Sequence, residues 1–298
     1  MMKKESIYNL IIAILLIIII YLLLSRKEKV ESFVNTDIVS SDNIYDEFYS
    51  KIYDKLFSAP YKIEFEVNDL DESILSKMDK DKVKILDIGC GSGQHIKLLS
   101  DRNYNVIGFD NSNEMLKVAK KTNPNVRFVL GNALDKQQFS AKKFNVISCY
   151  YFTVYYFKDL RKFLENVSFW LKEDGVFVVH IVNKDKFDPI LEPASPFPAF
   201  SLQKYTKGRV MKSDVVFNNF DYQSEFKIVN NNKANFIEKF NFRKKNKTRK
   251  QAHEFHMFNI KQFIRISKDY SLNLIGRTDL VNCGYEYQYL FYFRKETE

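Results

Sequence analysis

The most constraining feature of this sequence is an apolar run that ends in three closely spaced glycines. Residues 83–93 read Val-Lys-Ile-Leu-Asp-Ile-Gly-Cys-Gly-Ser-Gly, and a helix-compatible stretch follows. A buried parallel strand that ends in a turn with almost no side chains lets a ligand lie directly on the backbone. The helix that follows points its unpaired N–H groups into the same crevice. The dinucleotide-binding pattern Gly-x-Gly-x-x-Gly would need a glycine at position 94, where this chain has Gln94. The turn therefore does not match the dinucleotide-binding motif.

Strands and helices alternate after the glycine turn. Further strands are predicted at residues 104–110, 126–130, 145–150 and 176–182. Helices are predicted after Asn111-Ser112 and over 158–171. Asp110 ends the second strand, where a carboxylate can accept both hydroxyls of a ribose, although a helix cap is the commoner role. The alternation predicts a doubly wound α/β sheet with its ligand crevice at the carboxyl ends of the strands.

Other elements flank this core on both sides in the sequence. Residues 45–57 carry tyrosines at every fourth position, which places an aromatic stripe on one helix face, and a second helix is predicted over 60–78. Alternating stretches with turn residues between them predict an antiparallel β insertion, at about residues 205–257, over the mouth of the site. A last helix and two strands, predicted at 259–270, 272–277 and 286–294, complete a seven-stranded sheet.

The amino-terminal segment has a different character. Residues 6–25 carry no charge, and fourteen of them are Leu or Ile. Twenty helical residues span about 30 Å, the thickness of the hydrocarbon core of a bilayer. Fourteen Leu or Ile residues favour insertion by about 4–8 kcal/mol, and the run is long for a cleaved signal peptide, the main alternative. The sequence predicts an uncleaved transmembrane anchor over 1–25, a polar linker over 26–43 and one domain over 44–298.

Two segments account for the formal net charge of +9. Residues 1–30 hold five basic and two acidic side chains, and residues 243–250 hold six basic side chains and no acid. Such a run contacts anionic lipid or nucleic acid, or it forms a solvated hairpin tip, and we favour the hairpin tip for 243–250. No aromatic residue interrupts this run, which argues against stacking on RNA bases.

The potential metal ligands are few and scattered. Cys90, Cys149 and Cys283 lack CxxC spacing, so neither a disulfide framework nor a zinc site is expected, and a reducing compartment fits best. His253 and His256 lie three residues apart without further ligands nearby. We therefore expect no metal site.

Taken in order, these motifs resemble those of class I S-adenosylmethionine (SAM)-dependent methyltransferases. Asp87 to Gly93 is similar to the first motif of the family, Asp110 to its ribose-binding acid, and Gly131-Asn132-Ala133 to its adenine corner, where the family usually has an acid in place of Asn132. The resemblance implies a Rossmann-like fold, SAM as the cofactor, and a helix before the first strand that closes over the SAM pocket. The cofactor-binding residues that it implies are Asp87, Gly89, Cys90, Gly91, Gly93, Asp110, Asn111, Met115, Asn132, Ala133, Cys149 and Tyr150, with Tyr53 and Tyr61 from the preceding helices.

Within that family, residues 45–295 resemble small-molecule N-methyltransferases related to amino-sugar N,N-dimethyltransferases. The matching segments are 86–95, 113–116, 123–126, 144–149 and 252–258, together with Tyr61 and Glu64, which match a Tyr-x-x-Glu of that subgroup. Two places depart from the subgroup. Tyr156 stands where a histidine is common, and residues 180–183 replace an acid and an aromatic residue. The acceptor pocket is therefore expected to differ, and an amino sugar does not follow as the substrate.

Methyl transfer requires that the acceptor lone pair be aligned with the C–S bond and that water be excluded. We expect Tyr150, Tyr156 and His253 to line the acceptor site, with Tyr156 and His253 as the catalytic candidates. The favoured function is a membrane-anchored SAM-dependent methyltransferase with a cytoplasmic domain, acting at N or O of a small-molecule or lipid-associated acceptor. One alternative has a protein or RNA substrate that is reached through residues 243–250. The other is a catalytically degenerate SAM-binding scaffold.

Overall fold

A computed structural model describes residues 12, 14–17, 35–40, 43–195, 201, 203 and 206–296. None of the helices in these ranges is both long enough and apolar enough to cross a bilayer. Most of the predicted anchor lies outside the described residues. The chain divides into two units, Met1–Thr36 and Asp37–Glu298, and the description below concerns the second.

The core of this unit is a seven-stranded mixed sheet in the order β11-β12-β6-β5-β2-β3-β4. Five of its strands are parallel: β2 (Lys84–Ile88), β3 (Asn105–Asp110), β4 (Arg127–Leu130), β5 (Phe144–Cys149) and β6 (Leu171–Val182). The last strands of the chain, β11 (Leu272–Asp279) and β12 (Gln288–Lys295), add to the edge at β6 in antiparallel fashion. This is the Rossmann-like arrangement that the sequence predicted.

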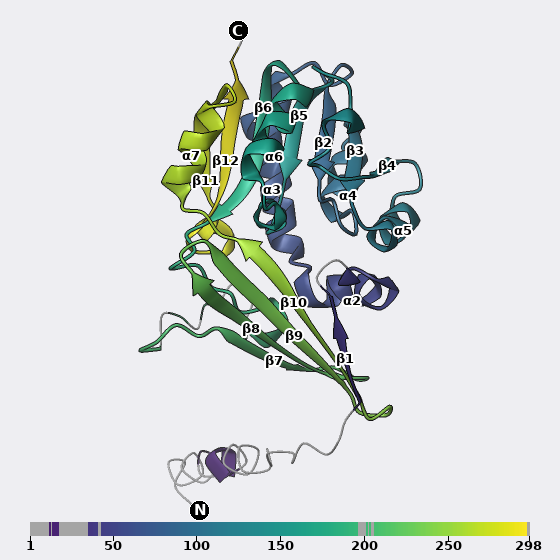
Figure 1. Ribbon diagram of the computed structural model, residues 1–298, viewed down its shortest axis with the longest axis vertical. Coiled ribbons are helices and arrows are strands. Elements are labelled where there is room, and N and C mark those ends of the chain that lie inside the picture. Colours follow the sequence, from purple (N-terminus) through teal and green to yellow (C-terminus); the bar gives the residue numbers. More distant parts are fainter. Residues whose placement is uncertain are drawn as a thin grey trace, which may run out of the picture. The chain divides into compact units, whose positions relative to one another are not determined.

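Helices cover both faces of the sheet (Figure 1). On one face lie α6 (Leu160–Trp170) and α7 (Ile260–Lys268), and on the other lie α3 (Pro60–Ser73), α4 (Gln94–Asp101) and α5 (Asn113–Thr122). Strand β6 shows why two cores form: Phe177 and Val179 face the first layer, while Val176 and Val178 face the second. Because side chains alternate along a strand, an almost wholly apolar strand is the one that can be buried on both sides.

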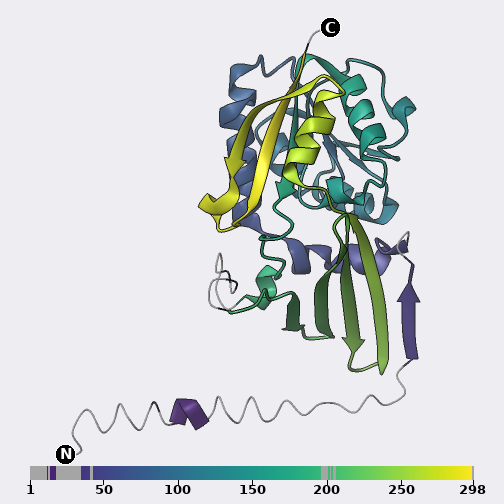
Figure 2. The same ribbon diagram turned by 60° about the vertical axis from the view of Figure 1, so that its left-hand side comes forward.

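A second sheet, the insertion sheet, lies beyond the carboxyl ends of the parallel strands (Figures 1 and 2). It has the order β1-β10-β9-β8-β7. Its strands are β1 (Asn35–Val39), β7 (Lys212–Val216), β8 (Asp221–Asn230), β9 (Lys233–Phe242) and β10 (Lys247–His256). The antiparallel pairs β7–β8, β8–β9 and β9–β10 confirm the predicted insertion. The sequence missed β1, because residues 35–39 were assigned to a linker that lacked periodic apolar residues.

Three predicted boundaries are corrected. Helix α2 (Glu47–Phe57) begins after Tyr45, because the Asp46 side chain accepts the Tyr49 N–H and caps the helix there. Helix α3 ends at Ser73, and a 3₁₀ turn at Leu75–Lys77 takes up the rest of the predicted helix. Strand β6 already begins at Leu171, because a pairing irregularity opposite β5 accommodates residues 172–175, which lie between the predicted helix and the predicted strand.

Candidate active site

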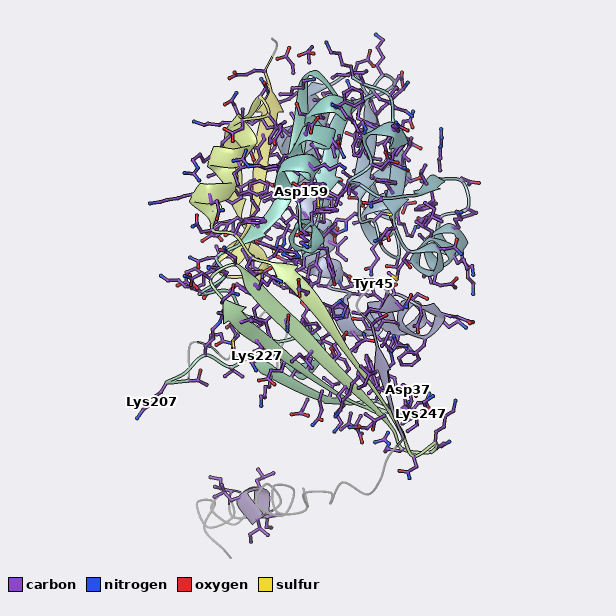
Figure 3. All side chains as sticks on the ribbon, in the orientation of Figure 1. Asp37, Tyr45, Asp159, Lys207, Lys227 and Lys247 are labelled. Carbon is purple, nitrogen blue, oxygen red and sulfur yellow. The ribbon has the colours of Figure 1, made fainter. Side chains whose placement is uncertain are left out.

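Two adjoining cavities lie where the main sheet meets the insertion sheet, at the level of Tyr45 (Figure 3). The strand-tip cavity is lined by the ends of β2, β3 and β4, and the aromatic cavity by α2, α3, the end of β5 and the insertion sheet. Both cavities are lined by Tyr45, Tyr53, Gly89, Gly91, Thr153, Tyr156 and His253. These shared residues mark the place where two ligands can meet.

The glycine turn between β2 and α4 forms the floor of this junction. Gly89 and Gly91 have φ values of 69° and 55°, a left-handed conformation that glycine adopts without strain. A Cβ at Gly89 would come within 2.2 Å of Thr153 Cγ2, so no other residue fits there. Gly93 lies at a close contact between two helices. A Cβ there would lie 2.9 Å from Asn123 Nδ2 and 3.1 Å from Ala119 Cβ, so this glycine allows α4 and α5 to pack closely.

Asp110 ends β3 and is tied to the glycine turn. Its carboxylate accepts the N–H of Gly91 at 2.9 Å and the N–H of Ser112 at 2.9 Å. Burial raises the pKa of Asp110, and the backbone donors oppose that shift. The side chain lines the strand-tip cavity and is held in place to accept further hydroxyl donors.

Four other predicted cofactor residues line the same cavity: Asn111, Met115, Asn132 and Ala133. The Asn132 Oδ1 accepts the N–H of Leu134 at 2.9 Å, which leaves its NH₂ group to meet a ligand. A donor at this position is suited to the ring nitrogens of a purine.

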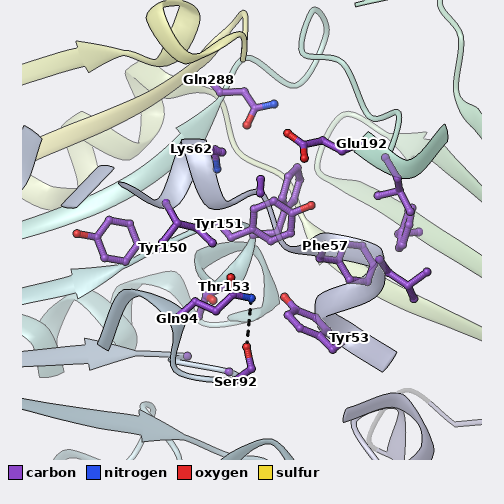
Figure 4. Close-up of a pocket in the computed structure, with 18 of the residues that line it drawn as sticks. Tyr53, Phe57, Lys62, Ser92, Gln94, Tyr150, Tyr151, Thr153, Glu192 and Gln288 are labelled. Carbon is purple, nitrogen blue, oxygen red and sulfur yellow. Dashed lines mark hydrogen bonds between the residues drawn. The ribbon is translucent and has the colours of Figure 1, made fainter. Parts of the chain in front are cut away.

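The aromatic cavity is enclosed largely by rings, with charged groups at one end (Figure 4). Lys62 and Glu66, one turn apart on α3, form an ion pair of 3.0 Å with side chains only 3% and 1% exposed. The His95 Nε2 lies 2.8 Å from the other Glu66 oxygen. Burial raises the pKa of Glu66, but Lys62 and His95 outweigh it and hold that pKa at about 2. Glu66 is therefore an anion at neutral pH.

Asp87 lies beside this charged group, at the end of β2. Its Oδ1 accepts the Ser148 hydroxyl at 2.8 Å, and burial raises its pKa to about 6 although His95 and Ser148 oppose the shift. A buried carboxylate without a full cationic partner is costly, and a positively charged ligand group would relieve that cost. The cavity therefore favours cationic ligands near the glycine turn.

Tyr156 and His253, the two predicted catalytic candidates, are in contact. The Tyr156 hydroxyl lies 2.5 Å from His253 Nδ1 and 2.8 Å from the Tyr45 hydroxyl. Burial raises the pKa values of Tyr45 and Tyr156 well above the usual range, so both hydroxyls stay protonated at neutral pH. The two side chains come from separate elements, Tyr156 from the 3₁₀ turn Thr153–Tyr156 after β5 and His253 from β10.

Tyr151 follows β5 in a strained conformation, with φ at 51°. A left-handed conformation costs a tyrosine about 1–3 kcal/mol and persists only where the surroundings hold it. Its carbonyl lies 2.7 Å from His180 Nδ1, and the Lys62 Nζ lies 5.0 Å from the centre of its ring. Burial lowers the pKa of His180 to about 3, so His180 is neutral and donates through Nδ1. His180 thus shapes the wall of the aromatic cavity.

The structure does not bring every predicted residue to a cavity. Gly93 packs between helices, and Cys149 is fully buried in β5 with its side chain in the core. Tyr61 is 64% exposed on the outer face of α3. Asp87, Cys90 and Tyr150 line the aromatic cavity. The binding roles of all these residues stay predictions.

Two groups of site residues were missed. Lys62 and Glu66 were not singled out, because a Lys–Glu pair four residues apart usually marks a solvated helix face. Glu238 was also missed, although the residue pattern of β9 could have revealed it. Its neighbours at alternate positions, Phe236 and Phe240, are apolar, so the alternation placed an acid on the apolar face of a strand.

The basic run lies at the turn between β9 and β10. Arg249 is buried against Asp46 at 2.6 Å, and Arg243 pairs with Asp221 at 2.8 Å. Lys247 lies 2.5 Å from Asp37 (Figure 3). Half of the six cations therefore make contacts within the chain, which weakens the case for a nucleic-acid surface.

Comparison with known proteins agrees with this geometry. Residues 85–175 match a family model described as a methyltransferase domain. An uncharacterised methyltransferase of Bacillus subtilis is 32% identical over 136 residues, 44% of this chain and 53% of its own length. A dTDP-3-amino-3,6-dideoxy-α-D-glucopyranose N,N-dimethyltransferase of Streptomyces fradiae is 30% identical over 99 residues, 32% of this chain and 38% of the relative.

Among solved structures, a SAM-bound amino pentose methyltransferase of Micromonospora echinaspora aligns with a TM-score of 0.58 and 17% identity, over 85% of this chain and 98% of the other. This likeness shows the fold. The chain spans about half the length of the curated relatives it matches first. Residues 85–175 therefore carry a methyltransferase domain, and the fold is that of class I SAM-dependent methyltransferases, the family that the sequence motifs resemble.

We predict that His180→Gln reduces the loss of stability in acid. His180 has a pKa of about 3 in the folded chain and about 6.5 when unfolded, so the unfolded chain takes up the proton first and stability falls as pH falls below 6.5. Between pH 7.5 and pH 5, protonation of this histidine in the unfolded chain lowers the free energy of unfolding by about 2 kcal/mol. The glutamine variant should not show this loss, because glutamine does not take up a proton. Urea unfolding at both pH values measures the difference.

The half-buried His256 supplies the control, because His256→Gln should change the pH dependence far less. Equal pH dependence in His180→Gln and the native chain would contradict the buried neutral state of His180.

Proposed function

We propose that this chain transfers the methyl group of SAM to a small-molecule or lipid-associated acceptor, at nitrogen or oxygen. The observation that carries the proposal is the junction of two cavities at Gly89, Tyr53 and Tyr156. The strand-tip cavity presents the Asp110 carboxylate and the Asn132 amide beside the glycine turn. The aromatic cavity is lined mainly by aromatic side chains. A donor in the first and an acceptor in the second would meet there.

The residues of the strand-tip cavity suit SAM. Asp110 would accept the ribose hydroxyls, Asn132 would donate to the adenine, and Gly89 and Gly91 would leave room for the methionyl part. Bound SAM supplies a methyl group on a positively charged sulfur. Asp87 and the faces of Tyr45 and Tyr53 favour that charge electrostatically.

The aromatic cavity suits an acceptor with an apolar body. Its walls include Phe57, Phe152, Phe187 and Phe226, and such walls exclude water from the reaction. Amino-sugar substrates are named for the Streptomyces relative. Here the wall carries Tyr156 in place of the usual histidine, so we propose a less polar acceptor than a sugar.

We predict that Asp110→Ala weakens SAM binding more than tenfold, which corresponds to about 1.4 kcal/mol. The Asp110 carboxylate lines the strand-tip cavity and is held in place by the Gly91 N–H of the glycine turn. Isothermal titration of the purified full-length chain in detergent measures the affinity. Asp135→Ala is the matched control, because Asp135 is a solvent-facing acid at the same edge of the sheet whose side chain bonds Gln137 and Gln138. An affinity that Asp110→Ala leaves unchanged would remove the ribose assignment.

We further propose that residues 1–25 anchor the enzyme in a membrane, with the domain on the cytoplasmic side. Support comes from the uncharged run of Leu and Ile over residues 6–25. The linker after it is polar and begins with Arg26, Lys27 and Lys29, which suits a membrane surface.

Introducing Ile17→Lys together with Ile18→Lys should release the chain from membranes. Two lysines at the centre of a span cost about 5–7 kcal/mol, close to the whole gain from its apolar residues. Alkaline extraction of membrane fractions followed by immunoblotting reads the outcome, and Tyr8→Lys near the end of the run serves as the control. Membrane retention of the double variant would argue against a spanning helix.

Incubation with methyl-labelled SAM and fractionated lipids, proteins and RNA of the host should place the label in the lipid or small-molecule fraction. Label in RNA or protein, lost on neutralising Lys244, Lys245 and Lys250, would favour a macromolecular substrate. SAM binding without label in any fraction would favour the scaffold alternative.

A further inference from the structure

A chain of hydrogen bonds runs from the cavity junction into the core of the insertion sheet. It begins at the Tyr156 hydroxyl, passes through the His253 ring and ends at Glu238, whose Oε2 lies 2.7 Å from His253 Nε2. Glu238 is wholly buried and His253 nearly so, whereas Tyr156 lines both cavities. The proposed function gives no role to the buried carboxylate.

Four hydrogen-bond donors surround the Glu238 carboxylate. The hydroxyls of Tyr49 and Tyr222 each donate to it at 2.7 Å, the Gln251 amide donates at 2.6 Å, and the fourth donor is His253. An ionised carboxylate has about four acceptor sites and no proton to give. Arg249 orients Gln251 by donating to its Oε1 at 2.7 Å, so the amide nitrogen faces Glu238.

This environment fixes the tautomer of His253. Because Glu238 can only accept, His253 must carry its proton on Nε2, and its Nδ1 lone pair is left to accept the Tyr156 hydroxyl. Tyr156 then has its oxygen free for donors. The Tyr45 hydroxyl supplies one of them, and an acceptor molecule in the cavity can supply another.

We infer that Glu238 is a positioning residue that makes His253 and Tyr156 a proton-accepting pair, and that the acceptor is a hydroxyl compound, of the phenol or alcohol class. This inference rests on the proposed methyltransferase function. The acceptor oxygen forms the new O–CH₃ bond, and the methyl–sulfur bond breaks with its electron pair left on sulfur. The hydroxyl proton passes to the Tyr156 oxygen as the tyrosine proton passes to His253 Nδ1. The imidazolium that results is paired with Glu238.

Such a pair discriminates between acceptor atoms. A neutral hydroxyl is a weak nucleophile and needs its proton removed as the bond forms, and a positioned base contributes about 10²–10⁴-fold to such a step. An aromatic amine of the same shape is already neutral at pH 7.5 and attacks through its free lone pair. Loss of the pair should therefore harm oxygen acceptors far more than nitrogen acceptors.

The first test reads the tautomer directly. The chain has four histidines, so ¹⁵N-histidine spectra of the full-length protein in detergent can be assigned with single His→Gln variants. We expect His253 to be protonated on Nε2 in the native chain and to become a mixture of tautomers in Glu238→Gln. Protonation on Nδ1, or an identical spectrum in the variant, would overturn the inference.

The second test uses two probes of equal shape, 4-ethylphenol and 4-ethylaniline, with methyl-labelled SAM. We expect transfer to the phenol, with kcat lowered about 100-fold in Glu238→Gln and in Tyr156→Phe while KM stays within about twofold. Glu225→Gln is the control, because Glu225 lies on the neighbouring strand β8, is partly exposed and lines neither cavity. Transfer to the aniline alone, or equal kcat for the phenol in all variants, would overturn the inference.

SAM titration of each variant separates this result from failure of the proposed function. A native chain that does not bind SAM would refute the proposed function, whereas the tautomer measurement would still decide the role of Glu238. Normal SAM binding by Glu238→Gln would show that the variant is folded.

Discussion

The whole site depends on a turn that has no room for side chains. The N–H groups of Gly89 and Cys90 bond to the Phe109 carbonyl at 2.7 and 3.2 Å, and the N–H of Gly91 bonds to Asp110. These bonds join the tips of β2 and β3, and Thr153 closes over Gly89 from the end of β5. A methyl group at Gly89 would push these strand ends apart. The position of the acid, and with it the strand-tip cavity, follows from this contact.

Three buried carboxylates set the electrostatic character of the region around the turn. Asp87, Glu66 and Glu238 are buried carboxylates, yet only Glu66 has a buried ammonium beside it. Glu238 is stabilised by neutral donors instead, and Asp87 retains a raised pKa. Asp87 lines the aromatic cavity next to the glycine turn, so the proposed sulfonium would meet a buried carboxylate there, whereas an anionic ligand would be repelled.

The sequence predicted the parts of the molecule that are locally encoded. The order of strands, the glycine turn and Asp110 all follow from short-range patterns, and even the insertion was visible as alternation. What could not be predicted depends on pairing between distant strands. Glu238 meets Gln251 because β9 and β10 pair in one particular register, and the exposure of Tyr61 depends on which face of α3 packs inward. A strand as short as β1 owes its form to its neighbour β10 rather than to its own residues.

The hydrogen-bonded chain is assembled from regions that lie far apart in the sequence. Tyr45 and Tyr49 precede the region that matches the methyltransferase family, Tyr156 lies inside it, and Glu238 and His253 come after it. The glycine turn, Asp110 and Tyr156 therefore lie within the matched segment, while Glu238 and His253, which hold Tyr156 in place, come from the insertion sheet. Substitutions in the insertion sheet can therefore change the surroundings of Tyr156 and leave the hydrogen bonds of the glycine turn intact.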